Sequence, residues 1–228
     1  MKALRPRIWW LWGGQVVTGS ASIIAAASWF GPTIRTLLQS SAVLDADRFV
    51  AAWLHAAASA SLTEFMVWVS WTHGTVGIVL LTAVAAGAAW RYSNRLPLPV
   101  LMAAVPGGLL LNVAVKHAVQ RPRPEWGYAP QALETYSFPS GHTDGATLFY
   151  GIVVVWLWPR VRGGGARIAL LIAATLMVLL VAASRIVLGV HFMTDCIAAV
   201  IEAGAWLTIC LFRAPRSAAS SSLEVDES

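Results

Sequence analysis

The chain has 228 residues, of which 57% are hydrophobic and 12% are charged, and its mean hydropathy is +0.66. A soluble domain typically has about 45–50% apolar and about 25% charged residues, so this composition excludes an ordinary soluble enzyme and indicates a membrane protein. The net charge is +5, but the 16 Lys and Arg residues are spread over short loops and form no single stripe, which argues against a nucleic-acid partner.

Six stretches are apolar enough over about 20 residues to cross a hydrocarbon core of about 30 Å. In chain order they are, roughly, residues 8–30, 64–90, 96–115, 141–158, 167–184 and 191–212. They predict an all-α fold, an integral membrane bundle of six transmembrane helices that forms a single domain over residues 1–212. The small, polar tail over residues 213–228 is typical of disorder and would be cytoplasmic.

Two segments in the first part of the chain allow further interpretations. The first stretch has a basic start and the sequence AAAS near its end, so a cleaved signal peptide is an alternative to a membrane span. Residues 44–56 favour a short helix that lies on the outer membrane surface.

The basic residues predict the orientation, because short loops rich in Lys and Arg stay cytoplasmic. With six spans, ten basic residues fall on the side of the termini: Lys2, Arg5, Arg7, Arg91, Arg95, Arg160, Arg162, Arg167, Arg213 and Arg216. Six fall on the other side: Arg35, Arg48, Lys116, Arg121, Arg123 and Arg185. Both termini are therefore expected in the cytoplasm. In a bacterium the membrane would be the cytoplasmic (inner) membrane, with the second side facing the periplasm or exterior.

Polar side chains gather at the outer ends of the third to sixth predicted spans. An ionisable group near the membrane core is costly, so each of them calls for a reason. The residues are Lys116 and Arg123 after the third span, Ser140, Gly141 and His142 at the start of the fourth, Arg185 at the end of the fifth, and His191 and Asp195 at the start of the sixth. The topology brings all of them to one membrane surface.

The chemistry of these groups complements a phosphate. Arg123 and Arg185 offer planar forks to phosphate oxygens, and Lys116 adds a compact positive charge. Ser140 is placed as the N-cap of the fourth helix, whose free backbone amides favour an anion. We therefore expect an anion site with His142 beside it.

His191 and Asp195 are four residues apart, so on a helix they lie on one face and can touch. An imidazole held by a carboxylate is fixed in one tautomer and stabilised when it becomes positive, which suits a base or a nucleophile. His142 is then free to give a proton to a departing oxygen. This pattern is typical of a hydrolase.

The same residues resemble the signature of the type 2 phosphatidic acid phosphatase superfamily. Its first part, K-x-x-x-x-x-x-R-P, matches KHAVQRPRP from Lys116 to Pro124, and its second part, P-S-G-H, matches residues 139–142. Its third part, S-R-x-x-x-x-x-H-x-x-x-D, matches SRIVLGVHFMTD from Ser184 to Asp195. The resemblance covers roughly residues 60–212, and no position of the signature is substituted.

The resemblance implies a two-step phosphate transfer that needs no metal and no cofactor. His191 would attack phosphorus and form a phosphohistidine, Asp195 would orient it, and His142 would protonate the leaving group. The phosphoryl oxygens would be held by Lys116, Arg123, Ser140, Gly141 and Arg185.

The expected substrate is a lipid phosphate that enters sideways from the outer leaflet. Undecaprenyl pyrophosphate is the first choice in a bacterium, with phosphatidylglycerol phosphate, phosphatidic acid and lipid A phosphates as alternatives. A lipid-to-lipid phosphotransferase is a further possibility. A transporter or non-enzymatic binder of anionic lipids is the alternative from another class, although binding alone does not need a nucleophile and an acid. The expected partners are membrane lipids, and the oligomeric state is left open.

Four further polar residues are assigned other roles. Arg121 lies beside the signature and is a candidate headgroup contact, whereas His73 favours a hydrogen-bonded core position. Asp144 falls in a first helical turn, where the dipole favours an acid, with a catalytic helper as the alternative. Glu202 lies seven residues after Asp195 on roughly the same face, which predicts an interhelical hydrogen bond beneath the site.

Overall fold

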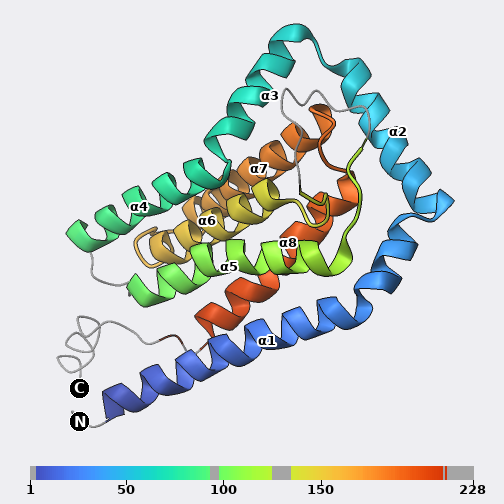
Figure 1. Cartoon of the computed structure of the whole chain (residues 1–228). Helices are drawn as coiled ribbons and strands as arrows, with labels where there is room; N and C mark the ends of the chain where they lie inside the picture. Colours follow the sequence, from blue (N-terminus) through green and yellow to red (C-terminus); the bar gives the residue numbers. More distant parts are fainter. Residues whose placement is uncertain (1–3, 93–97, 125–134, 213, 215–228) are drawn as a thin grey trace.

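The computed structural model describes residues 4–92, 98–124, 135–212 and 214, and within these ranges the chain forms eight α-helices and no strand (Figure 1). The helices are α1 (Leu4–Leu38), α2 (Ser41–Ala57), α3 (Ala60–Thr72), α4 (Thr75–Tyr92), α5 (Leu98–Val119), α6 (Gly141–Leu157), α7 (Gly164–Val187) and α8 (Met193–Leu211). The all-α prediction is confirmed. The predicted tail lies outside the described residues except for residue 214.

The predicted second span, residues 64–90, is wrong as a single helix. The structure ends α3 at Thr72 and begins α4 at Thr75. A Cβ at Gly77 would lie 2.1 Å from the backbone oxygen of Thr72, so the chain can fold this closely only with glycine at that position. The break places the end of α3 next to the functional site instead of leaving it within a straight span.

Three helical segments of the described chain are both long and apolar enough to cross a membrane: Pro99–Val119, Gly164–Val187 and Met193–Leu211. A fourth is added if α2 and α3, between which the chain bends by 118°, count as one broken span. The protein is therefore an integral membrane protein, and the count of six spans stays a prediction. The predicted helix over 44–56 is confirmed as part of α2, and its position on the outer membrane surface stays a prediction.

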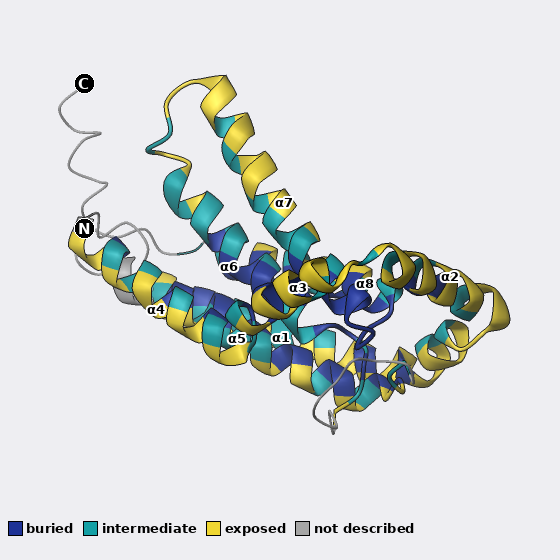
Figure 2. Ribbon diagram, turned by 90° about the horizontal axis from the view of Figure 1, so that it is seen from above, coloured by how far each residue is buried: buried dark blue, intermediate teal, exposed yellow. Residues whose placement is uncertain are grey.

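The core lies around α6, which packs against α4, α5, α7 and α8. Leu148 of α6 and Trp206 of α8 are buried in the largest apolar cluster. A Cβ at Gly108 of α5 would lie 2.5 Å from Leu148 Cδ1 and 2.8 Å from Trp206 Cδ1. The missing side chain thus allows α5 to approach both helices, and Figure 2 shows the resulting buried centre in dark blue.

The apolar side chains of α7 point outwards. In the most apolar window of α7 only 6% of residues are buried, and Leu171, Leu176 and Leu179 are 44%, 59% and 57% exposed. The yellow surface of α7 in Figure 2 illustrates this arrangement. In a membrane protein such a surface faces lipid, so α7 serves as a lipid-facing wall.

The first and last helices meet at one end of the bundle (Figure 1). The indole Nε1 of Trp12 in α1 donates a 2.8 Å hydrogen bond to the backbone oxygen of Cys210 in α8. The end of α5, the start of α6, the end of α7 and the start of α8 lie at the other end (Figure 1). The polar groups that the sequence places at these four helix ends therefore come together far from the Trp12 contact.

Candidate active site

Six of the eight predicted site residues line one cavity of about 540 Å³. They are Lys116, Arg123, Gly141, His142, Arg185 and His191. The other two, Ser140 and Asp195, are fully buried and are joined by a 3.1 Å hydrogen bond from the Ser140 amide to the Asp195 backbone oxygen. The structure thus assembles the residues of all three parts of the signature, whereas their individual roles stay predictions.

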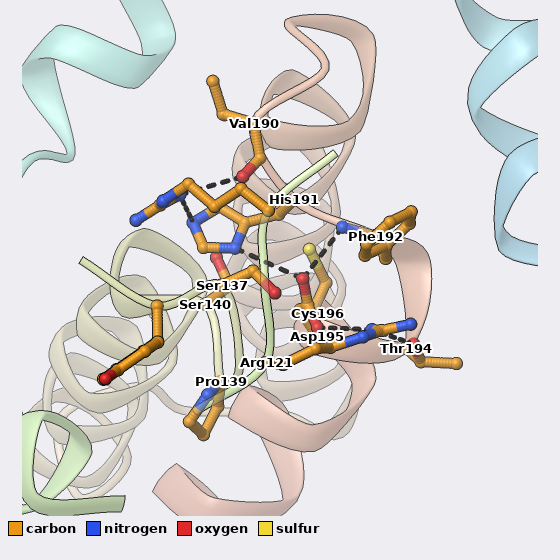
Figure 3. A network of polar contacts seen from close by, with 12 residues as sticks. Arg121, Ser137, Pro139, Ser140, Val190, His191, Phe192, Thr194, Asp195 and Cys196 are labelled. Atoms are coloured by element: carbon orange, nitrogen blue, oxygen red, sulfur yellow. Dashed lines mark hydrogen bonds and ion pairs between the residues drawn. The ribbon is translucent and has the colours of Figure 1, made fainter. Parts of the chain in front are cut away.

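His191 lies just before α8, which begins at Met193. The prediction that His191 and Asp195 share one helical face is therefore wrong in its geometry, although the residues do meet. Asp195 Oδ2 accepts a 2.9 Å hydrogen bond from the Phe192 amide and lies 3.5 Å from His191 Nδ1. The carboxylate caps the helix start, and this capping turns it towards the imidazole (Figure 3).

The tautomer of His191 follows from the contact between its Nε2 and Arg123. Arg123 Nη1 lies 3.2 Å from His191 Nε2, and a guanidinium can only donate. Nε2 must therefore be the acceptor, which leaves the proton on Nδ1, facing Asp195. The lone pair at Nε2 is the one a nucleophile would use.

The charge state of His191 agrees with this assignment. Burial lowers the pKa of the imidazole well below 6.5, and the nearby positive charges of Lys116, Arg185 and Arg123 lower this pKa further. His191 is accordingly neutral at pH 7. A neutral imidazole among three cations is prepared to react with a phosphate, because the cations attract the anion while the imidazole keeps its lone pair.

Hydrogen bonds to Thr135 and Val190 hold Arg123 in place. Its Nε and Nη2 donate to the backbone oxygen and hydroxyl of Thr135 at 2.7 Å and 2.9 Å. Its Nη1 donates to the Val190 backbone oxygen at 2.9 Å in addition to its contact with His191. The fork is thus fixed with one edge towards Nε2, where a phosphoryl group would bind.

Lys116 closes the cavity from the end of α5. Its Nζ donates to the backbone oxygens of Tyr136 at 3.1 Å and of Pro139. These oxygens belong to the segment that leads into α6, so Lys116 both orders this segment and brings a positive charge to the cavity wall.

Ser140 is the N-cap residue of α6, but its side chain makes no capping hydrogen bond. Its hydroxyl instead accepts a 3.1 Å hydrogen bond from Thr143 Oγ1. Gly141 and His142 open the helix and line the cavity. The positive end of the α6 dipole therefore points towards the predicted anion site.

Arg185 and His142 lie next to a part of the chain that the sequence left out of the site. Arg185 Nη1 donates to Ser70 Oγ of α3. A Cβ at Gly74, in the break between α3 and α4, would lie 3.5 Å from His142 Nε2. The broken second span thus binds Arg185 and lies close to His142, and its hydropathy gave no signal of either.

Arg121 corrects another expectation. It is 1% exposed and is not a headgroup contact, because its guanidinium pairs with Asp195 Oδ1 at 2.6 Å and with Asp47 Oδ2 at 2.8 Å. Figure 3 shows Arg121 directed towards the carboxylate of Asp195 on the side away from His191. Asp47, in α2, was not singled out from the sequence.

Two predictions about buried polar residues are confirmed. His73 Nδ1 lies 2.9 Å from the Val69 backbone oxygen, and its Nε2 lies 2.9 Å from the Tyr150 hydroxyl. Asn112 Nδ2 of α5 donates a 3.0 Å hydrogen bond to Glu202 Oε2 of α8, which is the interhelical bond expected beneath the site.

Comparisons with known proteins match the same part of the chain. The model of the PAP2 superfamily matches residues 95–217. Phosphatidylglycerophosphatase B of Bacillus subtilis (strain 168) is 34% identical over 129 residues, which are 54% of this chain and 62% of that protein. The matched region thus spans less than two thirds of the length of this relative.

A solved structure shares the fold. It is a transmembrane PAP2-type phosphatidylglycerolphosphate phosphatase from Bacillus subtilis, with a TM-score of 0.69 and 20% identity, and the match covers 90% of this chain and 97% of that one. The family match extends over more than half of the chain, and its residues include the complete signature at the cavity. The chain belongs to the PAP2 superfamily.

Proposed function

We propose that the protein is a membrane lipid phosphatase that hydrolyses a phosphomonoester through a phosphohistidine intermediate. The observation that carries this proposal is the environment of His191 Nε2, which faces the fixed fork of Arg123 while Asp195 lies 3.5 Å from Nδ1. An anion bound at this place meets a neutral nucleophile and a carboxylate that stabilises the positive imidazole formed on attack.

The proposed reaction has two steps. His191 Nε2 forms a bond to phosphorus as the phosphorus–oxygen bond to the lipid breaks, and His142, which enters this step as the imidazolium, gives a proton to the departing alkoxide. Burial and the surrounding cations disfavour this charged form of His142 without substrate, and the negative charge of the bound phosphate favours it. Water then attacks the phosphohistidine, His142 takes a proton from this water, and inorganic phosphate leaves. The cations at Lys116, Arg123 and Arg185 hold the phosphoryl oxygens throughout.

A lipid substrate is supported by the far wall of the cavity. Beyond the polar residues the lining is apolar and includes Val79 of α4 and Leu109, Leu110 and Val113 of α5. Leu110 and Val113 are also 72% and 49% exposed on the outer surface of α5. A headgroup can therefore bind among the cations while its acyl chains extend between α4 and α5 towards the bilayer.

We further propose phosphatidylglycerol phosphate as the preferred substrate, in place of undecaprenyl pyrophosphate, which was the first choice from the sequence. The relative in Bacillus subtilis is a phosphatidylglycerophosphatase, and no observation favours a pyrophosphate. We also propose that the site faces the periplasm or exterior, with both termini in the cytoplasm, as the distribution of basic residues predicts.

The test measures phosphate release by the purified protein in detergent. Phosphatidylglycerol phosphate, phosphatidic acid, undecaprenyl pyrophosphate and a lipid A phosphate are assayed in parallel, with and without EDTA. We expect EDTA-resistant release that is fastest from phosphatidylglycerol phosphate and lost in His191→Ala. His117→Ala is the matched control, because His117 is exposed on the neighbouring face of α5.

Two outcomes would contradict the proposal. Near-parental rates in His191→Ala would exclude His191 as the nucleophile. Consumption of lipid phosphate without a matching amount of free phosphate would indicate transfer to a second lipid. Acid quenching destroys phosphohistidine, so an alkaline quench of the parent with radiolabelled substrate should retain label on the protein, and His191→Ala should retain none.

A further inference from the structure

A buried charge network lies behind Asp195, on the side away from the cavity. Arg121 Nη1 donates to Asp195 Oδ1 at 2.6 Å, and Arg121 Nη2 donates to Asp47 Oδ2 at 2.8 Å. The side chains of Arg121, Asp47 and Asp195 are 1%, 0% and 0% exposed. We call these three residues the Asp47–Arg121–Asp195 network.

The network joins parts of the chain that are far apart in sequence. Asp47 belongs to α2, Arg121 follows α5, and Asp195 lies in the first turn of α8. Arg121 also donates to the Leu38 backbone oxygen at the end of α1 at 3.1 Å, and its guanidinium lies 4.2 Å from the ring centre of Phe192. The guanidinium thus contacts the end of α1, α2 and the start of α8 at the same time.

Asp47 has a second function at the start of α8. Its Oδ1 accepts a 3.0 Å hydrogen bond from the Thr194 amide, and its Oδ2 accepts a 2.6 Å hydrogen bond from the Thr194 hydroxyl. A carboxylate from another helix therefore caps the turn that presents Asp195. Asp47 and Ala51 are the buried residues of α2, so this contact is a main attachment of α2 to the bundle.

We propose that Asp47 and Arg121 are positioning residues for the phosphatase reaction, which act on His191 through Asp195. Arg121 holds Oδ1 of Asp195, so that Oδ2 is left to face His191. Asp47 balances the charge of Arg121, so that Asp195 keeps its negative field at the imidazole. This inference rests on the proposed function, and neither Asp47 nor Arg121 lines the cavity.

The charges of the network determine in which direction each variant should shift the protonation of His191. With both residues present, two carboxylates and one guanidinium leave one net negative charge behind His191. Removing the Asp47 charge leaves a neutral pair, and removing the Arg121 charge leaves two negative charges. The two changes therefore alter the field at His191 in opposite directions, and a positive imidazole is stabilised only by the second.

The other charged and titratable groups around His191 stay constant in such variants. They are Lys116 of α5, Arg123 after it, His142 of α6 and Arg185 of α7, together with Asp195 itself. If the network only stabilised the packing of α2 against α8, the two variants would behave alike, because losing either partner of a buried pair would loosen these helices in the same way. The sign of the response separates these two readings.

The experiment compares Asp47→Asn, Arg121→Gln and the double variant with the parent. The protonation of His191 is followed by nitrogen NMR of histidine-labelled protein in detergent, and the signal is assigned by its loss in His191→Gln. We expect His191 to protonate at lower pH than in the parent in Asp47→Asn and at higher pH in Arg121→Gln. In the double variant, which removes one charge of each sign, the titration should return close to that of the parent.

The kinetic constants KM and kcat provide a second test. Because neither residue lines the cavity, KM should change little. The kcat of Asp47→Asn should fall about tenfold, because the positive imidazole formed on attack loses the negative field that stabilises it, and the double variant should recover part of this loss. Asp45→Asn is the matched control, since Asp45 is an exposed carboxylate on the same helix, and it should leave the titration and kcat unchanged. If Asp47→Asn does not fold, Arg121→Lys, which keeps the charge, should titrate like the parent while Arg121→Gln does not.

Shifts of His191 in the same direction in both single variants, or no shift in either, would overturn the inference. A parent that releases no phosphate from any lipid would refute the proposed function, but it would leave the NMR titration able to decide whether the network acts on His191. The two failures are therefore distinguishable.

Discussion

Arg123 offers a sharp test of the site, because its geometry and its charge can be separated. Its guanidinium makes four hydrogen bonds, of which Nη1 supplies one to Val190 and one to His191 Nε2. When phosphate bonds to Nε2, the Nη1 donor that faced this nitrogen is left facing a phosphoryl oxygen. Arg123→Lys keeps the positive charge but loses the planar fork and its attachment to Thr135.

The expected loss follows from this one donor. A hydrogen bond to a charged group contributes about 1.5–3 kcal/mol, and a donor that acts on the developing charge of the transition state contributes in this range or above it. At 25 °C this energy corresponds to a decrease in kcat/KM of roughly 10- to 150-fold. The remaining ammonium should preserve part of the binding, so KM should rise less than kcat falls.

The assay is phosphate release from the preferred lipid over a range of concentrations in detergent micelles, with thermal unfolding as the check on folding. Arg162→Lys is the matched control, because it makes the same chemical change at an exposed residue beyond the other end of α6. A kcat/KM for Arg123→Lys within about threefold of the parent, a change below about 0.7 kcal/mol in barrier height, would show that positive charge alone is sufficient and that the planar fork contributes nothing.

Two further predictions concern stability. Burial, followed by the charges of Lys116 and Arg185, lowers the pKa of His191 well below 6.5, so the unfolded chain takes up this proton at higher pH than the folded chain. The folded protein is therefore most stable above about pH 6.5 and loses stability as the pH falls below this value. Between about pH 7.5 and pH 5 the thermal unfolding temperature should fall more in the parent than in His191→Gln. Glu202→Leu removes the acceptor of the buried Asn112 amide and should lower the free energy of unfolding by about 1–3 kcal/mol. Glu202→Gln keeps an acceptor and should lower it less. Equal unfolding temperatures for the parent and Glu202→Leu would show that the bond contributes nothing.

The site could be predicted from the sequence because its residues occur at fixed spacings next to the ends of apolar segments. An apolar run gives the direction of its helix, so the ends of consecutive spans alternate between the two membrane surfaces. Lys116 and His142 were therefore expected at the same membrane surface although a loop separates them, and both line the cavity. The signature then limited the chemistry more strongly than hydropathy could, because it fixed which of the basic residues belong together.

The course of the second span could not be predicted in the same way. Hydropathy averages over about 20 residues and does not register a turn of two or three residues within an apolar segment. Gly77 is the residue that permits this turn, but its role depends on the approach of the Thr72 backbone, which is a contact in space. The contact between Arg185 and Ser70 depends on the same turn, so it was missed for the same reason.

Asp47 is different, because the sequence did contain a signal for it. In α2 the buried or partly buried side chains include Leu44, Asp47, Ala51 and Leu54, which are spaced as one face of a helix. Asp47 thus occupies the middle of an otherwise apolar stripe, where a carboxylate is unfavourable unless a cation meets it. The hydropathy of α2 led only to a surface helix, and the partner, Arg121, lies 74 residues away. An acid within an apolar helical face therefore indicates a buried partner elsewhere in the chain, and in this protein that partner connects α2 to the carboxylate that faces the proposed nucleophile.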